Sequence, residues 1–173
     1  MEFVEALVDK TPYRWWSDGE STLEDGPFYC KKIPSIETIQ KSGCNCAGLI
    51  NILQLCRGLV VPGVKINHFY AGGTYAWYEY LSSINALEPV NRSKSYPKGS
   101  LLLRRYRDVK DQGHLAVLYT SGILTNQKLL HCYYNRGITI DESFQDSDSW
   151  CKDGYYEYIC VNWFYADLLQ SEF

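Results

Sequence analysis

The second half of the chain consists of short β-prone runs, and this constrains the fold more than any other feature of the sequence. Branched and aromatic residues gather there between Gly, Asn and Asp residues, a texture typical of antiparallel strands joined by turns. We expect strands at residues 100–106, 114–119, 128–134, 137–140 and 155–164. Asn135-Arg136-Gly137 is typical of a tight hairpin turn. The sequence therefore predicts a meandering antiparallel sheet of roughly five strands.

The first half shows helical periodicity instead. Apolar residues recur at helical spacing over residues 46–59, no proline interrupts them, and Asn45 is a suitable N-cap. We expect further helices at residues 2–8, 36–40 and 73–83, and an irregular stretch over most of 13–43 that could border a cleft. Helices followed by strands predict an α+β domain with the helices on one face of the sheet. The N-terminus of the central helix can then meet the edge of the sheet.

Length and composition predict a single domain spanning residues 1–173. A chain of this length with 46% hydrophobic residues can bury one core. The net charge of −3 and the pI near 5.6 argue against general binding to nucleic acid. The one basic cluster (Arg104, Arg105, Arg107 and Lys110) is interpreted as the solvated end of a strand.

The sequence carries no feature that directs it into a membrane. It has no run of 18 apolar residues, and residues 1–10 lack the basic start and apolar core of a signal peptide. Seven cysteines without a regular framework favour free thiols in a reducing compartment. We therefore expect no membrane insertion, and a cytoplasmic protein or one released without a signal peptide, as a phage or viral enzyme would be.

Cys46 is the strongest candidate for a reactive side chain. A thiolate is the nucleophilic form of cysteine, and a helix N-terminus lowers the thiol pKa. Gly43 allows a tight turn before Cys46, and the small Ala47 and Gly48 let a substrate approach main-chain N–H groups that could hold an oxyanion. The alternative is that Cys46 is only a small buried apolar residue.

Two of the three histidines lie in expected strands of the same sheet. His114 opens the run 114–119, and His131 lies in the run 128–134. Nucleophilic catalysis requires a base within reach of the thiol and a further group that orients the base. We predict that His114 takes the proton from Cys46 and that His131 holds His114; each histidine could instead be an ordinary core residue.

The arrangement resembles the NlpC-type cysteine peptidases of the papain-like superfamily. Asn45-Cys46-Ala47-Gly48-Leu49-Ile50 is similar to the family's Asp-Cys-Ser-Gly-Leu-Val motif, and Pro12-Tyr13-Arg14-Trp15 to its Pro-Tyr-x-Trp segment. Pro97-Lys98-Gly99-Ser100-Leu101 is similar to its Pro-Gly-Asp-Leu strand, and residues 113–119 and 128–132 to the two histidine strands that follow. The chain departs from the pattern at Trp16, Asn45, Ala47, Ser100 and Ala116.

The resemblance implies a papain-like fold and a cysteine peptidase or amidase. Cys46 would be the nucleophile, His114 the base, His131 the third member of the triad, and Tyr13 part of the oxyanion hole. It further implies a peptide or peptidoglycan fragment as substrate, with no cofactor. Two alternatives stay open: a papain-like thiol hydrolase or acyltransferase acting on a lipid acyl or isopeptide substrate, and a non-catalytic peptide-binding module.

Other clusters of polar residues are interpreted as structural. The cysteines lack the spacing of a zinc site, so no metal is expected. We interpret His68 as non-catalytic. The acidic residues Asp141, Glu142, Asp146 and Asp148 lack the pattern of a calcium loop and are interpreted as a solvated turn.

Overall fold

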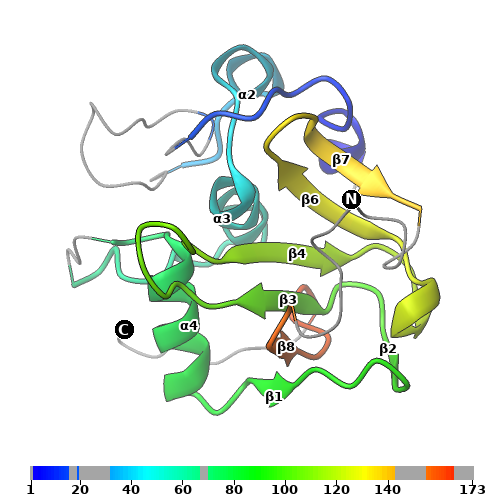
Figure 1. The fold of residues 1–173 in the computed structure, drawn as a ribbon. Helices are drawn as coiled ribbons and strands as arrows, with labels where there is room; N and C mark the ends of the chain where they lie inside the picture. Colours follow the sequence, from blue (N-terminus) through cyan, green and yellow to red (C-terminus); the bar gives the residue numbers. More distant parts are fainter. Residues whose placement is uncertain (1, 16–18, 20–31, 67–69, 143–154, 166–173) are drawn as a thin grey trace.

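The computed structural model describes residues 2–15, 19, 32–66, 70–142 and 155–165, and it shows an α+β fold (Figure 1). Within these residues the α-helices come first: α1 (Glu2–Glu5), α2 (Ile36–Ser42), α3 (Cys46–Cys56) and α4 (Thr74–Ser83). The strands follow: β1 (Glu88–Pro89), β2 (Ser95–Tyr96), β3 (Leu101–Arg104), β4 (His114–Leu118), β5 (Gly122–Ile123), β6 (Leu129–Tyr133), β7 (Gly137–Asp141) and β8 (Tyr158–Cys160). A short 3-10 turn, η2 (Leu124–Asn126), lies between β5 and β6.

Six strands form one antiparallel sheet in the order β1-β8-β3-β4-β6-β7, and β2 pairs with β5 apart from it. At the centre, Val117 of β4 lies opposite Leu101 of β3 and Leu130 of β6. β6 and β7 form a hairpin in which His131 faces Thr139. The prediction of an α+β fold with an antiparallel sheet is confirmed. The five expected strands correspond to β3, β4, β6, β7 and β8, and β1 adds a sixth.

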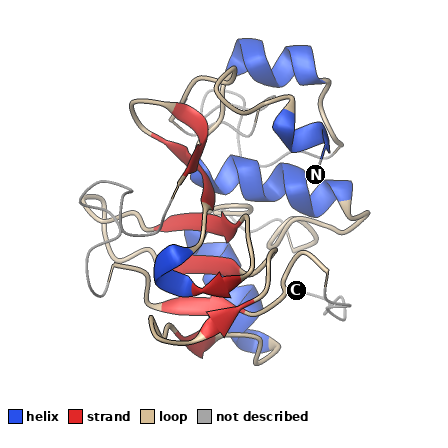
Figure 2. Ribbon diagram, turned by 90° about the vertical axis from the view of Figure 1, so that its right-hand side faces the viewer, coloured by secondary structure: helices blue, strands red, loops and turns tan. Residues whose placement is uncertain are grey.

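The two faces of the sheet are covered differently. Leu103, Leu115 and Leu130 belong to the larger core, which also contains buried residues from all four α-helices. Their strand neighbours point to the other face, because side chains alternate along a strand. That second face forms a smaller core with residues from outside the α-helices: Tyr96, Leu102, Ala116, Leu118, Leu124, Leu129, Tyr156 and Ile159. In Figure 2 much of the helical ribbon lies above the strands, as a separate layer.

Helix ends differ from the expected ones for local reasons. α2 starts at Ile36, where Ser35 caps it by accepting a hydrogen bond from the Thr38 N–H at 3.1 Å. It runs on to Ser42, because the chain leaves the helix at Gly43, which has φ of 74° and donates its N–H to the Ile39 carbonyl. α3 ends at Cys56, before the expected residue 59, and Gly58 follows with φ of 73°. No helix in the described ranges has both the length and the apolar character needed to cross a lipid bilayer.

Candidate active site

Cys46 is the first residue of α3 and lies where a tight turn delivers the chain into the helix. The Asn45 side chain accepts a hydrogen bond from the Gly48 N–H at 2.8 Å, which caps the helix. Gly43 has φ of 74°, and a Cβ there would lie 2.7 Å from the Pro12 carbonyl oxygen, so glycine is required at the turn. The half-buried Cys46 side chain is therefore held in a defined place at the head of α3.

The turn before Cys46 is tied to two other segments. The Cys44 N–H donates to the Pro12 carbonyl at 3.1 Å, and the Cys44 carbonyl accepts from the Arg14 N–H at 2.9 Å. The buried Cys132 thiol of β6 also donates to the Cys44 carbonyl, at 2.9 Å. These contacts fix the helix head against the sheet on one side and against residues 12–14 on the other.

The structure brings His114 and His131 together. His114 is the first residue of β4, and Gly113 before it has φ of 76°; a Cβ on Gly113 would lie 2.4 Å from the Arg104 carbonyl oxygen. His131 lies at the centre of β6, and both imidazoles are buried. His114 Nε2 lies 3.1 Å from His131 Nδ1, within hydrogen-bonding distance.

A buried carboxylate continues this chain of contacts. Asp141, the last residue of β7, places Oδ2 3.1 Å from His131 Nε2. Its other oxygen, Oδ1, lies 2.7 Å from the Arg136 guanidinium. The interpretation of Asp141 as part of a solvated turn is wrong, because Asp141 lies two residues after Thr139 and so on the face that carries His131.

The hydrogen-bond partners decide which ring nitrogens carry protons. A carboxylate only accepts, so His131 Nε2 donates to Asp141, and in the neutral His131 ring Nδ1 is left as an acceptor. His114 Nε2 must then donate to His131, so the lone pair of the neutral His114 ring lies on Nδ1. The carboxylate thus sets the tautomers of both histidines, one after the other.

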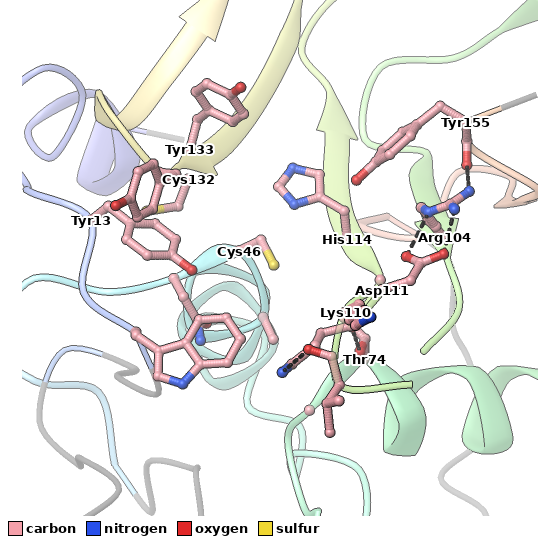
Figure 3. A pocket seen from close by; sticks show the side chains of 18 residues that line it. Tyr13, Cys46, Thr74, Arg104, Lys110, Asp111, His114, Cys132, Tyr133 and Tyr155 are labelled. Atoms are coloured by element: carbon pink, nitrogen blue, oxygen red, sulfur yellow. Dashed lines mark hydrogen bonds and ion pairs between the residues drawn. The ribbon is translucent and has the colours of Figure 1, made fainter. Parts of the chain in front are cut away.

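Cys46 and His114 line one pocket of about 580 Å³, and Figure 3 shows the sulfur and the imidazole at the same cavity. The main-chain N–H groups of Leu115 and Ala47 act on the thiol and lower its pKa. Leu115 directly follows His114, so the sulfur lies beside the start of β4. A helix-borne thiol and a strand-borne imidazole thus line one cavity where the two layers join.

The electrostatics favour an uncharged pair at rest. Burial raises the pKa of the Cys46 thiol to about 11, although the N–H groups of Leu115 and Ala47 oppose this. Burial, together with the neighbouring His131, lowers the pKa of His114 well below its usual value. The Ala47 N–H at the helix N-terminus lowers the pKa of Cys46, as expected, but burial outweighs it and the net pKa is raised.

Tyr13 is held beside Cys46 by the main chain. It forms an isolated parallel bridge with Cys44, and its ring lies edge-on to Tyr134 at 5.6 Å between centroids. Tyr13 lines the same pocket as Cys46 (Figure 3). Burial and, next, the neighbouring Cys46 raise the pKa of the Tyr13 hydroxyl, so it stays protonated and able to donate a hydrogen bond.

The two walls of the pocket differ in character. One wall is aromatic and includes Trp15, Tyr133 and Tyr134. The opposite wall is the polar connection between β3 and β4, where Asp111 holds Arg104 by hydrogen bonds to Nε at 3.0 Å and to NH2. Thr74 of α4 donates to the Gln112 carbonyl at 2.6 Å and supports that connection. The pocket can thus grip an apolar group on one side and polar main chain on the other.

Several residues named in the sequence analysis lie outside the described part of the chain: Trp16, His68, Asp146 and Asp148. Among the described residues, no group of three or more His, Cys, Asp or Glu side chains is arranged to hold a metal ion. The five cysteines described (Cys44, Cys46, Cys56, Cys132 and Cys160) carry free thiols.

Comparison with known proteins assigns neither a family nor a function to the chain. No protein-family model matches the sequence, and no curated protein matches it either. The site must therefore be interpreted from its own geometry.

Proposed function

We propose that this protein is a cysteine hydrolase that cleaves an amide bond through an acyl-Cys46 intermediate. The observation that carries the proposal is the hydrogen-bonded chain His114–His131–Asp141, which begins at the pocket that Cys46 lines. Titratable groups with shifted pKa values that lie at a pocket are typical of active sites, and the lowered pKa of His114 at this pocket supports the proposal.

The first half of the reaction uses Cys46 and His114. His114 Nδ1 removes the thiol proton as the sulfur attacks the carbonyl carbon, because both groups are neutral at rest. The imidazolium formed on His114 is stabilised through His131 by the negative charge of Asp141. His114 then returns the proton to the leaving amine, the C–N bond breaks, and a thioester remains on Cys46.

The second half returns the enzyme to its starting state. His114 Nδ1 removes a proton from water as the water oxygen attacks the thioester carbonyl. The C–S bond breaks, the proton returns to the sulfur, and a carboxylic acid leaves. In both halves, the negative oxygen of the tetrahedral intermediate would be held by the Tyr13 hydroxyl and by main-chain N–H groups at the head of α3.

The proposed substrate class is a peptide, with a cell-wall stem peptide as the specific candidate. The aromatic wall suits an apolar side chain, and the wall opposite offers main-chain groups to an extended peptide. The choice of a stem peptide rests on the resemblance of the Cys46, His114 and His131 segments to NlpC-type peptidases. The proposal that the fold is papain-like rests on the same resemblance.

The experiment is a comparison of wild type with Cys46→Ala and Cys56→Ala on stem peptides, lipid acyl esters and isopeptide-linked peptides. Cys56 is exposed at the far end of α3 and serves as the matched control. We expect wild type and Cys56→Ala to release an amine from the stem peptides, and Cys46→Ala to release none. Mass spectrometry of quenched reactions should show an acyl adduct on Cys46. Full activity of Cys46→Ala on any substrate would refute the mechanism, and turnover of esters alone would refute the substrate class.

A further inference from the structure

Arg136 lies at the turn of the β6–β7 hairpin, outside the pocket. Its side chain is 43% exposed, while that of Asp141 is only 4% exposed. Arg136 NH2 lies 2.7 Å from Asp141 Oδ1, and the other carboxylate oxygen faces His131. A carboxylate held at both oxygens cannot rotate about its Cβ–Cγ bond without breaking one contact. The orientation of Asp141 toward His131 is thus coupled to a cation near the protein surface.

Arg136 also touches the ring that packs on His131. Its guanidinium carbon lies 5.5 Å from the centroid of the Tyr133 ring. Tyr133 in turn stacks on His131 at 5.7 Å between centroids, with 21° between the ring planes. Arg136 therefore contacts both groups that restrain His131, the carboxylate on its edge and the phenol ring on its face.

We infer that Arg136 is a positioning residue that locks His131 into the tautomer with the proton on Nε2, and through it keeps the lone pair of His114 on Nδ1. This inference rests on the proposed function for its catalytic consequence. Arg136 does not line the pocket, so it acts only through Asp141, Tyr133 and His131.

The charge of Arg136 has a second effect on the carboxylate. Desolvation alone would raise the pKa of Asp141, but His131 and Arg136 together outweigh it and hold that pKa below its usual value. Without the guanidinium, Asp141 would keep only His131 as a partner. In a variant without Arg136, the Asp141 carboxylate would be less firmly held and less firmly ionised. It would then favour the Nε2–H tautomer of His131 over the Nδ1–H tautomer less strongly.

The same hairpin provides a matched control. Lys128 and Glu142 form an exposed ion pair of 2.8 Å at the other end of the two strands. Their side chains are 40% and 76% exposed, so removing the Lys128 charge changes the surface charge by the same amount as Arg136→Ala without touching Asp141. Lys128→Ala thus separates a local effect of Arg136 from a general loss of one positive charge.

The test uses four variants and a signal that does not depend on catalysis. Wild type, Arg136→Ala, Arg136→Lys and Lys128→Ala are labelled with ¹⁵N-histidine, and the ring-nitrogen shifts are measured at neutral pH. We expect wild type, Arg136→Lys and Lys128→Ala to show His114 and His131 as single Nε2–H tautomers. Arg136→Ala should show averaged Nδ1 and Nε2 shifts for His131.

Turnover gives the second signal. Arg136→Ala should lower kcat by about tenfold with KM within about twofold of wild type, the low end of what misplacing a catalytic group costs. Arg136→Lys should recover most of that loss, and Lys128→Ala should lose nothing. Arg136→Gln keeps a polar side chain, shorter than that of Arg, without the charge. It replaces Arg136→Ala where truncation lowers Tm, and it should show the same loss of kcat.

The outcomes separate this inference from the proposed function. Unchanged tautomers in both Arg136→Ala and Arg136→Gln would overturn the inference, whatever their activity. Averaged tautomers in these variants, together with a wild type that hydrolyses no acyl substrate, would uphold the role of Arg136 and refute the proposed function.

Discussion

His131 Nε2 lies 3.1 Å from Asp141 Oδ2, although a complete hairpin turn separates the two residues along the chain. The contact is diagonal across the β6–β7 ladder, because His131 faces Thr139 and Asp141 faces Leu129. Diagonal neighbours on one face of a sheet are within reach of long side chains. Both side chains are buried, so the contact is sheltered from water and from screening by salt.

Replacing Asp141 with Asn should slow the reaction while preserving the fold. Asn has nearly the same shape but no charge, and its amide can donate to His131 and so favour the wrong tautomer. We expect kcat to fall on the order of 10- to 100-fold with little change in KM. Steady-state kinetics on the best substrate would measure this. Wild-type kcat in Asp141→Asn would remove Asp141 from the mechanism.

The same variant should reveal a pH-dependent contribution to stability. The pKa of Asp141 is lowered in the folded state, so its carboxylate stabilises the fold above the pKa of the unfolded chain, and this contribution is lost as pH falls through the folded pKa. Denaturant titrations should show wild type more stable than Asp141→Asn by about 1–3 kcal/mol at pH 6. The difference should shrink toward pH 3, and a constant difference would contradict the assignment.

Tyr13→Phe tests the oxyanion role of one hydroxyl. Loss of a hydrogen bond that forms only in the transition state should lower kcat by about 10- to 100-fold and leave KM nearly unchanged. Tyr134→Phe is the control, because Tyr134 lines the same wall beside Tyr13 but is 69% exposed. Equal losses in the two variants would indicate packing of the wall and not an oxyanion contact.

The reactivity of Cys46 should report a neutral thiol. Because its pKa is raised to about 11, the rate of iodoacetamide alkylation at Cys46 should rise about tenfold per pH unit between pH 7 and pH 10. Peptide mapping separates Cys46 from the exposed Cys56, which serves as an internal reference. A rate at Cys46 that is already constant below pH 7 would instead mean a resting thiolate–imidazolium pair.

Gly113→Ala should damage both stability and activity. The residue adopts φ of 76°, and an added Cβ would lie 2.4 Å from the Arg104 carbonyl oxygen, directly before His114. Gly58→Ala is the matched control: Gly58 has φ of 73°, with nothing within 4 Å of the added atom. The control should lose about 1–2 kcal/mol from backbone strain. Gly113→Ala should lose more free energy of unfolding than Gly58→Ala, and it should also lower kcat. Denaturant titrations would measure the first effect, and equal losses of stability in the two variants would show that the clash is relieved.

Much of the fold follows from periodicity in the sequence. The helical spacing over residues 46–59 and the β-prone runs after Pro97 predict α3 and the central strands, because each is long enough to show its period. β1, β2 and β5 contain two residues each, so no alternation marks them. β1 pairs with β8, and β2 pairs with β5, so each forms through a partner distant along the chain, which local sequence does not encode.

The candidate site could be predicted only in part. Cys46, His114 and His131 are rare residue types at marked positions, whereas Asp141 begins an acidic stretch and resembles the start of a loop. The alternation of Gly137, Thr139 and Asp141 on one face of β7 is the signal that would have placed it beside His131. The raised pKa of Cys46 could not be predicted, because it depends on burial and not on the helix that carries the thiol.

The side chains of the candidate site lie in two different layers of the fold, so the site can lose its geometry before the layers unfold. The sulfur belongs to the helical layer, whereas the imidazoles and the carboxylate belong to strands. Among the described residues, the Leu115 N–H acts on the sulfur, and the Cys132 thiol donates to the Cys44 carbonyl just before α3, so both join the two layers at the pocket. A slight sliding of one layer over the other would part sulfur from imidazole while every strand pairing survived. Heating should therefore abolish catalytic activity at a temperature below the Tm of unfolding.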